Sequence, residues 1–117
     1  MKNYVNLLGI LGKDPEIRTV GEKKVCNFTV ATHEYFKGEQ ITTWHYCVAW
    51  NGTADVVSKM HQGDTVDITG SIKYETYEKD GVKKTTTKIE SHIIRPISRK
   101  QQKESDDMPK ESDDMPY

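Results

Sequence analysis

Aromatic and small side chains alternate in one segment of the sequence, residues 41–50, which reads ITTWHYCVAW. Successive side chains of a β-strand point to opposite faces, so Trp44, Tyr46 and Trp50 would share one face of a strand. The other face would carry His45, Cys47 and Ala49. Small residues suit the inside of a narrow barrel, whereas two tryptophans and a tyrosine do not fit into the same space. We therefore predict that these aromatic side chains lie on an outward face of a sheet.

A second alternating segment, residues 65–77, extends the predicted outward face. Lys73, Glu75 and Tyr77 fall on one side of this segment. The opposite, inward side would carry Val66, Ile68, Ile72 and Tyr74. We expect Tyr77 on the outward face with Lys73 nearby, and Phe36 on an adjoining loop.

An outward aromatic face of this kind has two uses. Flat rings stack on the bases of a single nucleic-acid strand whatever its sequence, or they become buried against another protein subunit. Phosphates need positive partners, so nearby basic residues favour the first use. These residues are Lys37, Lys73, Lys83, Lys84, Lys88 and Arg95. For any single lysine a solvated charged surface is the simpler interpretation, and the pattern alone leaves nucleic acid, a protein interface and an ordinary core open.

Strands and one helix must position these residues. Alternation and β-branched residues predict five strands, at residues 4–11, 25–32, 41–50, 65–77 and 82–94, with a short extended piece at residues 16–20 after the first. A polar loop is expected at residues 33–40, and Asp80-Gly81 predicts a hairpin turn. The one helix would begin with Thr53 as its N-cap and stop near Gly63. Its apolar stripe would contain Val56, Val57 and Met60.

This order of elements predicts an all-β fold with one helix, namely the five-stranded Greek-key barrel of the OB-fold. The chain has 117 residues, which is enough for one domain. We place this domain at residues 1–97.

The C-terminal segment has a different composition. Residues 1–102 carry a net charge of +3, whereas residues 103–117 carry a net charge of −4. The sequence KESDDMP at residues 103–109 is repeated at residues 110–116, before Tyr117. Such a segment cannot bury enough apolar surface to offset the entropy lost on ordering. We therefore expect a disordered acidic tail at residues 98–117.

The sequence does not support a membrane segment, a signal peptide, a disulfide scaffold, a metal or cofactor site, or enzyme activity. No run approaches the roughly 18 apolar residues of a membrane helix, and Lys13-Asp14-Pro15 follows the apolar start where a signal peptide would have small residues. Cys26 and Cys47 are too few for a disulfide scaffold, so we expect reduced, buried thiols in a cytoplasmic protein. Zinc-like spacing, a phosphate-binding glycine loop and a catalytic triad are also missing, so we expect no metal, no cofactor and no enzyme activity.

Four segments of the chain form a specific series. They are NLLGILGKDPEIR at residues 6–18, VCNFTVAT at 25–32, TTWHYCVAWNGTADVVSKMHQGDTVDITG at 42–70 and YEKDGVKKTTTKIE at 77–90. In this order they resemble the bacterial-type single-stranded DNA-binding proteins, the SSB family, in a short or phage- or mobile-element-like version. The resemblance implies binding and protection of single-stranded DNA, independent of sequence, during replication, recombination and repair. It also implies a homotetramer in the bacterial cytoplasm or nucleoid, or in a phage-infected cell.

The resemblance also implies roles for individual residues. Base stacking is implied for Phe36, Trp44, Trp50 and Tyr77. Phosphate contact is implied for Lys73, and the other candidate DNA-binding residues are Lys37, Lys83 and Lys84. His45 falls at a position that supports a subunit contact in the family. The chain departs from the family where Tyr46, Glu75 and Thr76 replace basic residues, so we expect weaker phosphate neutralisation and a shallower salt dependence than in a typical member.

The C-terminal residues resemble the tip with which the family recruits replication, recombination and repair proteins. These residues are Asp113, Asp114, Met115, Pro116 and Tyr117. The ring and the proline would fill a pocket, while the α-carboxylate and the aspartates would meet arginine or lysine. The first copy of the repeat has no free carboxylate, so only the second copy is expected to dock.

One alternative function belongs to a different class. It is an OB-fold protein-interaction subunit of a replication or primosome assembly, with the aromatic face used as an interface. Tryptophan fluorescence separates the two functions, because stacking on poly-dT would quench Trp44 and Trp50 whereas an interface would leave their emission unchanged.

Overall fold

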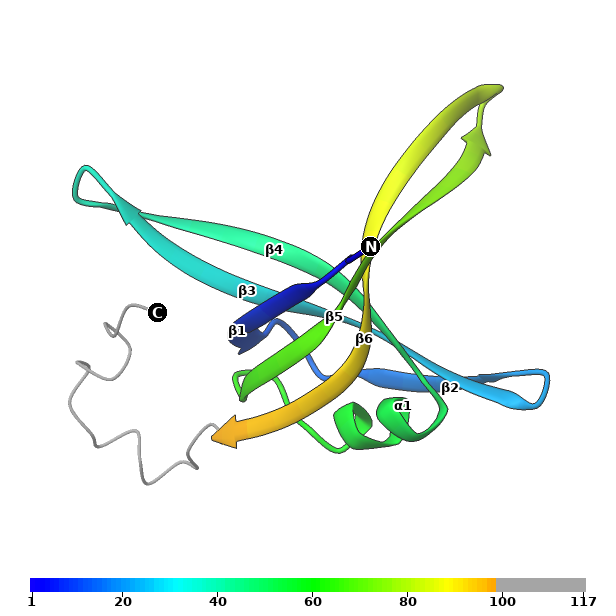
Figure 1. The fold of residues 1–117 in the computed structure, drawn as a ribbon, viewed down its shortest axis with the longest axis horizontal. Coiled ribbons are helices and arrows are strands. Elements are labelled where there is room, and N and C mark those ends of the chain that lie inside the picture. The colour runs from blue at the N-terminus through cyan, green and yellow to red at the C-terminus, as the bar shows by residue number, and fades with distance from the viewer. Residues whose placement is uncertain (99–117) are drawn as a thin grey trace.

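Residues 1–98, which this computed structural model describes, form six β-strands and one helix (Figure 1). The elements are β1 (Val5–Leu11), β2 (Glu16–Val20), β3 (Lys23–Phe36), β4 (Glu39–Trp50), α1 (Asn51–Ser58), β5 (Thr65–Lys79) and β6 (Val82–Ser98). The five expected strands are all present, several are longer than the sequence predicted, and the extended piece at residues 16–20 forms a sixth strand, β2. The expected tail lies outside the described residues, apart from Ser98 at the end of β6.

The sheet closes on itself. The strand order is β1-β5-β6-β4-β3-β2, and an additional pairing joins β1 to β3. Five strands therefore complete the barrel, while β2 lies outside it and pairs only with the start of β3. All pairings are antiparallel except that of β4 with β6. This topology confirms the predicted Greek-key barrel with one helix, the OB-fold.

Closure requires a close approach of β1 to β3. Ile10 and Leu11 of β1 pair with Ala31 and Val30 of β3. A Cβ atom on Gly9 would collide with the carbonyl oxygen of Ala31. Any side chain at Gly9 would push the two strands apart, so a glycine is needed where the barrel closes.

The hydrophobic core lies inside the barrel and between the barrel and α1. Cys26, Phe28 and Val30 of β3 are buried there, as their predicted common face requires. The helix α1 contributes Ala54 and Val57, which are also buried. The other core residues are Leu11, Cys47, Ala49, Met60, Val66, Ile68, Ile89 and Ile94.

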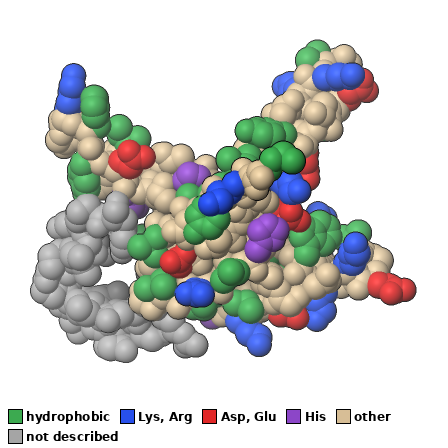
Figure 2. Space-filling view, viewed as in Figure 1, with side chains coloured by type: hydrophobic (Ala, Val, Ile, Leu, Met, Phe, Trp, Pro, Cys, Tyr) green, Lys and Arg blue, Asp and Glu red, His purple; other side chains and the backbone are tan. Residues whose placement is uncertain are grey.

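Two long hairpins, β3–β4 and β5–β6, diverge from the barrel (Figure 1). The β5–β6 turn is Asp80-Gly81, as predicted, and both residues have positive φ, which suits a two-residue hairpin turn. The predicted polar loop at residues 33–40 is wrong, because only Lys37-Gly38 forms a turn and the other residues are paired in strands. Figure 2 shows lysine or arginine side chains at the tips of both hairpins.

Polar hydrogen bonds between strands explain why the loop prediction failed. The Nδ1 atom of His33 lies 3.0 Å from Oγ1 of Thr42 and 3.1 Å from Nε2 of Gln40. The hydroxyl of Tyr35 donates to Oε1 of Gln40 at 3.3 Å. These contacts join β3 to β4 without the apolar alternation by which a strand is recognised in a sequence.

Two further predictions need correction. Thr53 is not the N-cap, because α1 starts at Asn51 and its N-cap Trp50 makes no side-chain capping bond. The helix also ends at Ser58, well before Gly63. Tyr74 does not face the core: 71% of its surface is exposed, because β5 has left the barrel at this point and projects into solvent.

The apolar stripe predicted for the helix is only partly correct. Val57 is buried within the helix, and Met60 is buried just beyond its end. Val56 is 41% exposed and therefore lies outside the stripe.

Candidate nucleic-acid interface

The register of β3 and β4 determines which side chains share the outward face. Residues that stand directly opposite each other in an antiparallel pair lie on the same face. Trp44 stands opposite Ala31, and Tyr46 stands opposite Thr29. The exposed fraction is 52% for Trp44, 59% for Tyr46 and 39% for Trp50. The sequence prediction that these three rings face outward from the barrel is confirmed.

Trp44 rests against the connection between β1 and β2. A Cβ atom on Gly12 would lie 2.5 Å from Cζ3 of Trp44 and 2.5 Å from Oγ1 of Thr29. The Gly12 N–H also donates to the carbonyl of Thr29 at 3.0 Å. One edge of the indole is therefore supported by backbone, while about half of its surface remains open for a stacking partner.

The outward face continues across β6 and β5. The parallel pairing sets Val48 of β4 beside Glu90 of β6, so Lys88, two residues earlier, also lies on this face. Lys73 of β5 stands directly opposite Lys88, and Tyr77 stands opposite Lys84. The face thus carries rings on β4 and β5, with lysines between them.

Three of the predicted DNA-binding residues lie elsewhere. Phe36 is not on a loop but ends β3, where it stands opposite Glu39 on the face away from Trp44. Lys37 lies in the turn beyond it, with its Nζ atom 5.3 Å from the centroid of the Phe36 ring. Lys83 stands opposite Glu78 and is on the other face of its hairpin from Tyr77. A strand that touched both Phe36 and Trp44 would have to pass around the tip of the β3–β4 hairpin.

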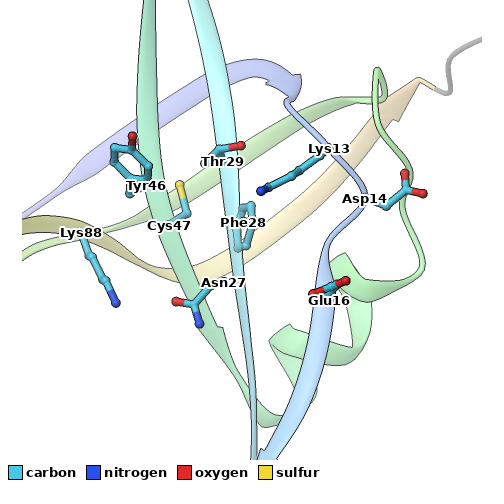
Figure 3. A pocket seen from close by; sticks show the side chains of 9 residues that line it. All are labelled: Lys13, Asp14, Glu16, Asn27, Phe28, Thr29, Tyr46, Cys47 and Lys88. Atoms are coloured by element: carbon cyan, nitrogen blue, oxygen red, sulfur yellow. The ribbon is translucent and has the colours of Figure 1, made fainter.

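A groove of about 480 Å³ lies beside Tyr46 (Figure 3). In Figure 3, Lys13 and Lys88 approach it from different sides, the first from the β1–β2 connection and the second from β6. The other residues that line the groove are Asp14, Glu16, Asn27, Phe28, Thr29 and Cys47. The lining combines the ring of Tyr46 with two lysines and two carboxylates, so a flat group such as a base can stack on the ring beside these charges.

Sequence reasoning missed Lys13 as part of this site, and a hydrogen bond of its neighbour Asp14 positions the connection that carries it. The backbone N–H of Gln62 donates to Oδ1 of Asp14 at 2.6 Å, which ties the β1–β2 connection to the segment after α1. Tyr46 is predicted on the outward face with the two tryptophans, but it is not among the candidate DNA-binding residues, because it replaces a basic residue of the family. Its neighbours Asn27 and Thr29 could have been found by pairing the two strands in register.

Two lysines of the outward face are paired with carboxylates. Nζ of Lys73 lies 3.5 Å from Oε1 of Glu90, and Nζ of Lys88 lies 3.4 Å from Oε1 of Glu75. Their positive charge is therefore partly neutralised within the protein itself.

His45 lies on the inward side of β4, opposite Val30. Its Nε2 atom is 2.9 Å from the hydroxyl oxygen of Thr32. Burial lowers the pKa of the His45 imidazole, because the charged form loses solvation. The subunit-contact role expected for His45 stays a prediction.

The cysteines are unsuited to nucleophilic chemistry. Both Cys26 and Cys47 are free and buried. Burial raises the pKa of Cys47 to about 12. Burial and the nearby Glu16 carboxylate also raise the pKa of Cys26. At neutral pH both thiols are protonated, and the thiolate is the reactive form.

Comparisons with known proteins agree with this geometry. The model of a family described as the single-strand binding protein family matches residues 2–97. The chain belongs to the single-strand binding protein family. Within residues 1–98, no helix is both long enough and apolar enough to cross a membrane.

Relatives in this family come from distant sources. Single-stranded DNA-binding protein 1 of Chlorobaculum tepidum is 41% identical over 96 residues, covering 74% of this chain and 59% of the relative. The mitochondrial single-stranded DNA-binding protein of Drosophila melanogaster is 36% identical over 95 residues, covering 74% of this chain and 65% of the relative. Single-stranded DNA-binding protein 3 of Listeria innocua is 34% identical over 107 residues, covering 86% of this chain and 67% of the relative. The chain thus spans about two thirds or less of the length of these relatives.

A solved structure supports the fold. The structure described as a Plasmodium falciparum SSB complex with ssDNA superposes with a TM-score of 0.78, covering 84% of this chain and 96% of that chain. The sequence identity is 24%, so the similarity concerns the fold. The expected docking residues 113–117 lie outside the described residues.

Proposed function

We propose that this protein binds and protects single-stranded DNA without regard to sequence, in the cytoplasm, during replication, recombination and repair. The observation that carries this proposal is the outward face on which Trp44, Tyr46, Trp50 and Tyr77 are exposed together with lysines. Each of the three relatives described above is named as a single-stranded DNA-binding protein. Binding of this kind needs no catalytic group.

Stacking explains why such binding would tolerate any sequence. Every base has a flat π-face, and each stack on an aromatic ring contributes about 1–3 kcal/mol. Trp44 is supported from behind by Gly12, so little ordering is required when a base arrives. Phe36, Lys37 and Lys83 would contact DNA that passes around the hairpin tips.

Assembly into a homotetramer belongs to the same proposal. Within residues 1–98, β1 pairs with β5 along Val5–Ile10 but with β3 only at Ile10 and Leu11. The other edge of its first half therefore has backbone groups that a second copy can pair with. Tyr4 and Leu8, which flank this edge, are 64% and 48% exposed. Mass measurement in solution tests this part of the proposal, with a tetramer expected and a monomer contradicting it.

Recruitment of replication, recombination and repair proteins would use Asp113–Tyr117. Deletion of Tyr117 removes the terminal ring and moves the free carboxylate, so we expect it to abolish capture of these proteins and to leave DNA affinity nearly unchanged. The measurement compares full-length and truncated protein for both activities. Equal capture of the same partners by the two proteins would contradict the docking role.

The alternative, a protein-interaction subunit, is supported by the exposed aromatic patch alone. A fluorescence titration with dT oligomers of increasing length at two salt concentrations separates it from DNA binding. DNA binding predicts quenching of tryptophan emission that saturates with length and weakens as salt rises. Unchanged emission at every length would favour the interface.

A further inference from the structure

Two lysines of the outward face stand where the sheet would be more stable without them. Lys73 on β5 and Lys88 on β6 are directly opposite each other in the antiparallel register. Like charges in this arrangement repel and destabilise the strand pair. When a local rule is broken in this way, a functional reason is a common explanation.

Each lysine has a carboxylate partner placed diagonally across the hairpin. Lys73 meets Glu90 at 3.5 Å and Lys88 meets Glu75 at 3.4 Å. Strong charged hydrogen bonds are shorter, about 2.7–2.9 Å between nitrogen and oxygen. These two pairs are therefore loose, and at least one partner of each is well exposed. The carboxylates offset the repulsion without holding the lysines firmly.

The four charges lie in the path between the exposed rings. Lys88 also lines the groove beside Tyr46. Tyr77 lies on the same face as Lys73, four residues further along β5. A strand whose bases stack on Tyr46 and on Tyr77 would carry a phosphate over the two lysines.

We propose that Lys73 and Lys88 form one phosphate-binding site, which Glu90 and Glu75 occupy until DNA displaces them. This inference rests on the proposed binding of single-stranded DNA and assigns a further site to it. On binding, the backbone phosphate takes the place of the carboxylates as the partner of both ammonium groups. The two glutamates therefore compete with DNA and reduce its affinity.

Salt dependence is the property that this competition changes. The DNA phosphate releases its condensed cations when the lysines bind it, but the displaced carboxylates attract cations again, so the net release of cations is smaller. For single strands the slope of log K against log salt increases by about 0.7 for each phosphate neutralised. The paired lysines lower this slope, in agreement with the shallow salt dependence expected from the sequence.

The test replaces the competing carboxylates and measures binding of a dT oligomer of about 16 nucleotides, which is long enough for one OB-fold. Glu75→Gln and Glu90→Gln should each tighten binding about two- to fivefold at low salt, since exposed ion pairs are weak. The double variant should steepen the salt slope by about 0.7, the value for the one phosphate that the two lysines bind. Glu22→Gln is the matched control, because it makes the same change in net charge and Glu22 has no ion pair within residues 1–98.

A second set of variants separates a local site from a general charge effect. Lys88→Gln should remove the gain produced by Glu75→Gln, so that the two changes together bind like Lys88→Gln alone. If Glu75→Gln and Glu90→Gln bind no tighter than Glu22→Gln, or if the gain survives in the Lys88→Gln background, the phosphate site is wrong. Failure of the unmodified protein to bind the oligomer would instead contradict the proposed function itself.

Discussion

The indole of Trp44 can rest against the backbone of Gly12 because this glycine has no side chain. The residue-scale prediction is that Gly12→Ala displaces the indole, because the new methyl group would come 2.5 Å from its Cζ3 atom. We expect a shift of Trp44 emission, weaker DNA binding and a stability loss of about 1–3 kcal/mol from overpacking. Gly52→Ala is the control, since a methyl group there meets open space. Identical emission from the two variants would contradict the supporting role of Gly12.

His45 links stability to pH. Its pKa is lower in the folded protein than the usual value of about 6.5, because burial disfavours the charged imidazole. As the pH falls through 6.5, the unfolded chain binds a proton at His45 before the folded chain does. The contribution of the neutral His45 to the free energy of unfolding is therefore present above about pH 6.5 and is lost progressively below it.

The expected outcome is a smaller loss of thermal stability in His45→Gln than in the unmodified protein between about pH 7.5 and about pH 5.5. The glutamine side chain can still hydrogen bond to Thr32. His92→Gln is the control, because His92 is an exposed histidine on β6. An equal loss in His45→Gln and the unmodified protein would show that His45 does not contribute to the pH dependence.

Much of the site could be predicted at this scale. The alternation in residues 41–50 was sufficient to place Trp44, Tyr46 and Trp50 on the outward face. The position of Lys88 could not be derived in the same way, because it depends on the parallel pairing between β4 and β6. No pattern within one strand contains the register of two strands that are distant in sequence.

At the scale of elements, the two faces of the β5–β6 hairpin provide a matched comparison. Tyr77 lies on the face that carries Lys73, and Tyr74 lies on the opposite face, although both rings are exposed. We expect Tyr77→Ala to weaken binding of a dT oligomer by the loss of one stack, about 1–3 kcal/mol. Tyr74→Ala should have little effect in the same titration. Equal losses from the two variants would mean that strand register does not define the interface.

The elements also show where sequence reasoning stops. The strands inside the barrel were predicted well, because burial imposes alternation on them. Residues 33–40 were mistaken for a loop, since hydrogen bonds among His33, Tyr35, Gln40 and Thr42 hold the hairpin beyond the core. The start of α1 was misplaced because Asn51 uses its side chain to accept the Lys24 N–H at 3.1 Å, which ties the first helical residue to β3.

On the scale of the whole molecule, a closed barrel supports two arms that reach beyond it (Figure 1). The barrel fixes the rings of β4, and the arms carry Phe36, Tyr77 and most of the candidate lysines. A single strand that followed this face would contact both the barrel and the arms. The account therefore depends on bases stacking on the ring at the centre of the face, Trp44.

The most direct measurement uses the variant Trp50→Phe, in which Trp44 is the only tryptophan of the chain. Its emission is followed while a dT oligomer is added, and a mobility-shift assay on the same samples reports how much DNA is bound. We predict strong quenching of Trp44 that rises in parallel with the bound fraction. Unchanged Trp44 emission while the DNA is bound would contradict stacking on the outward face.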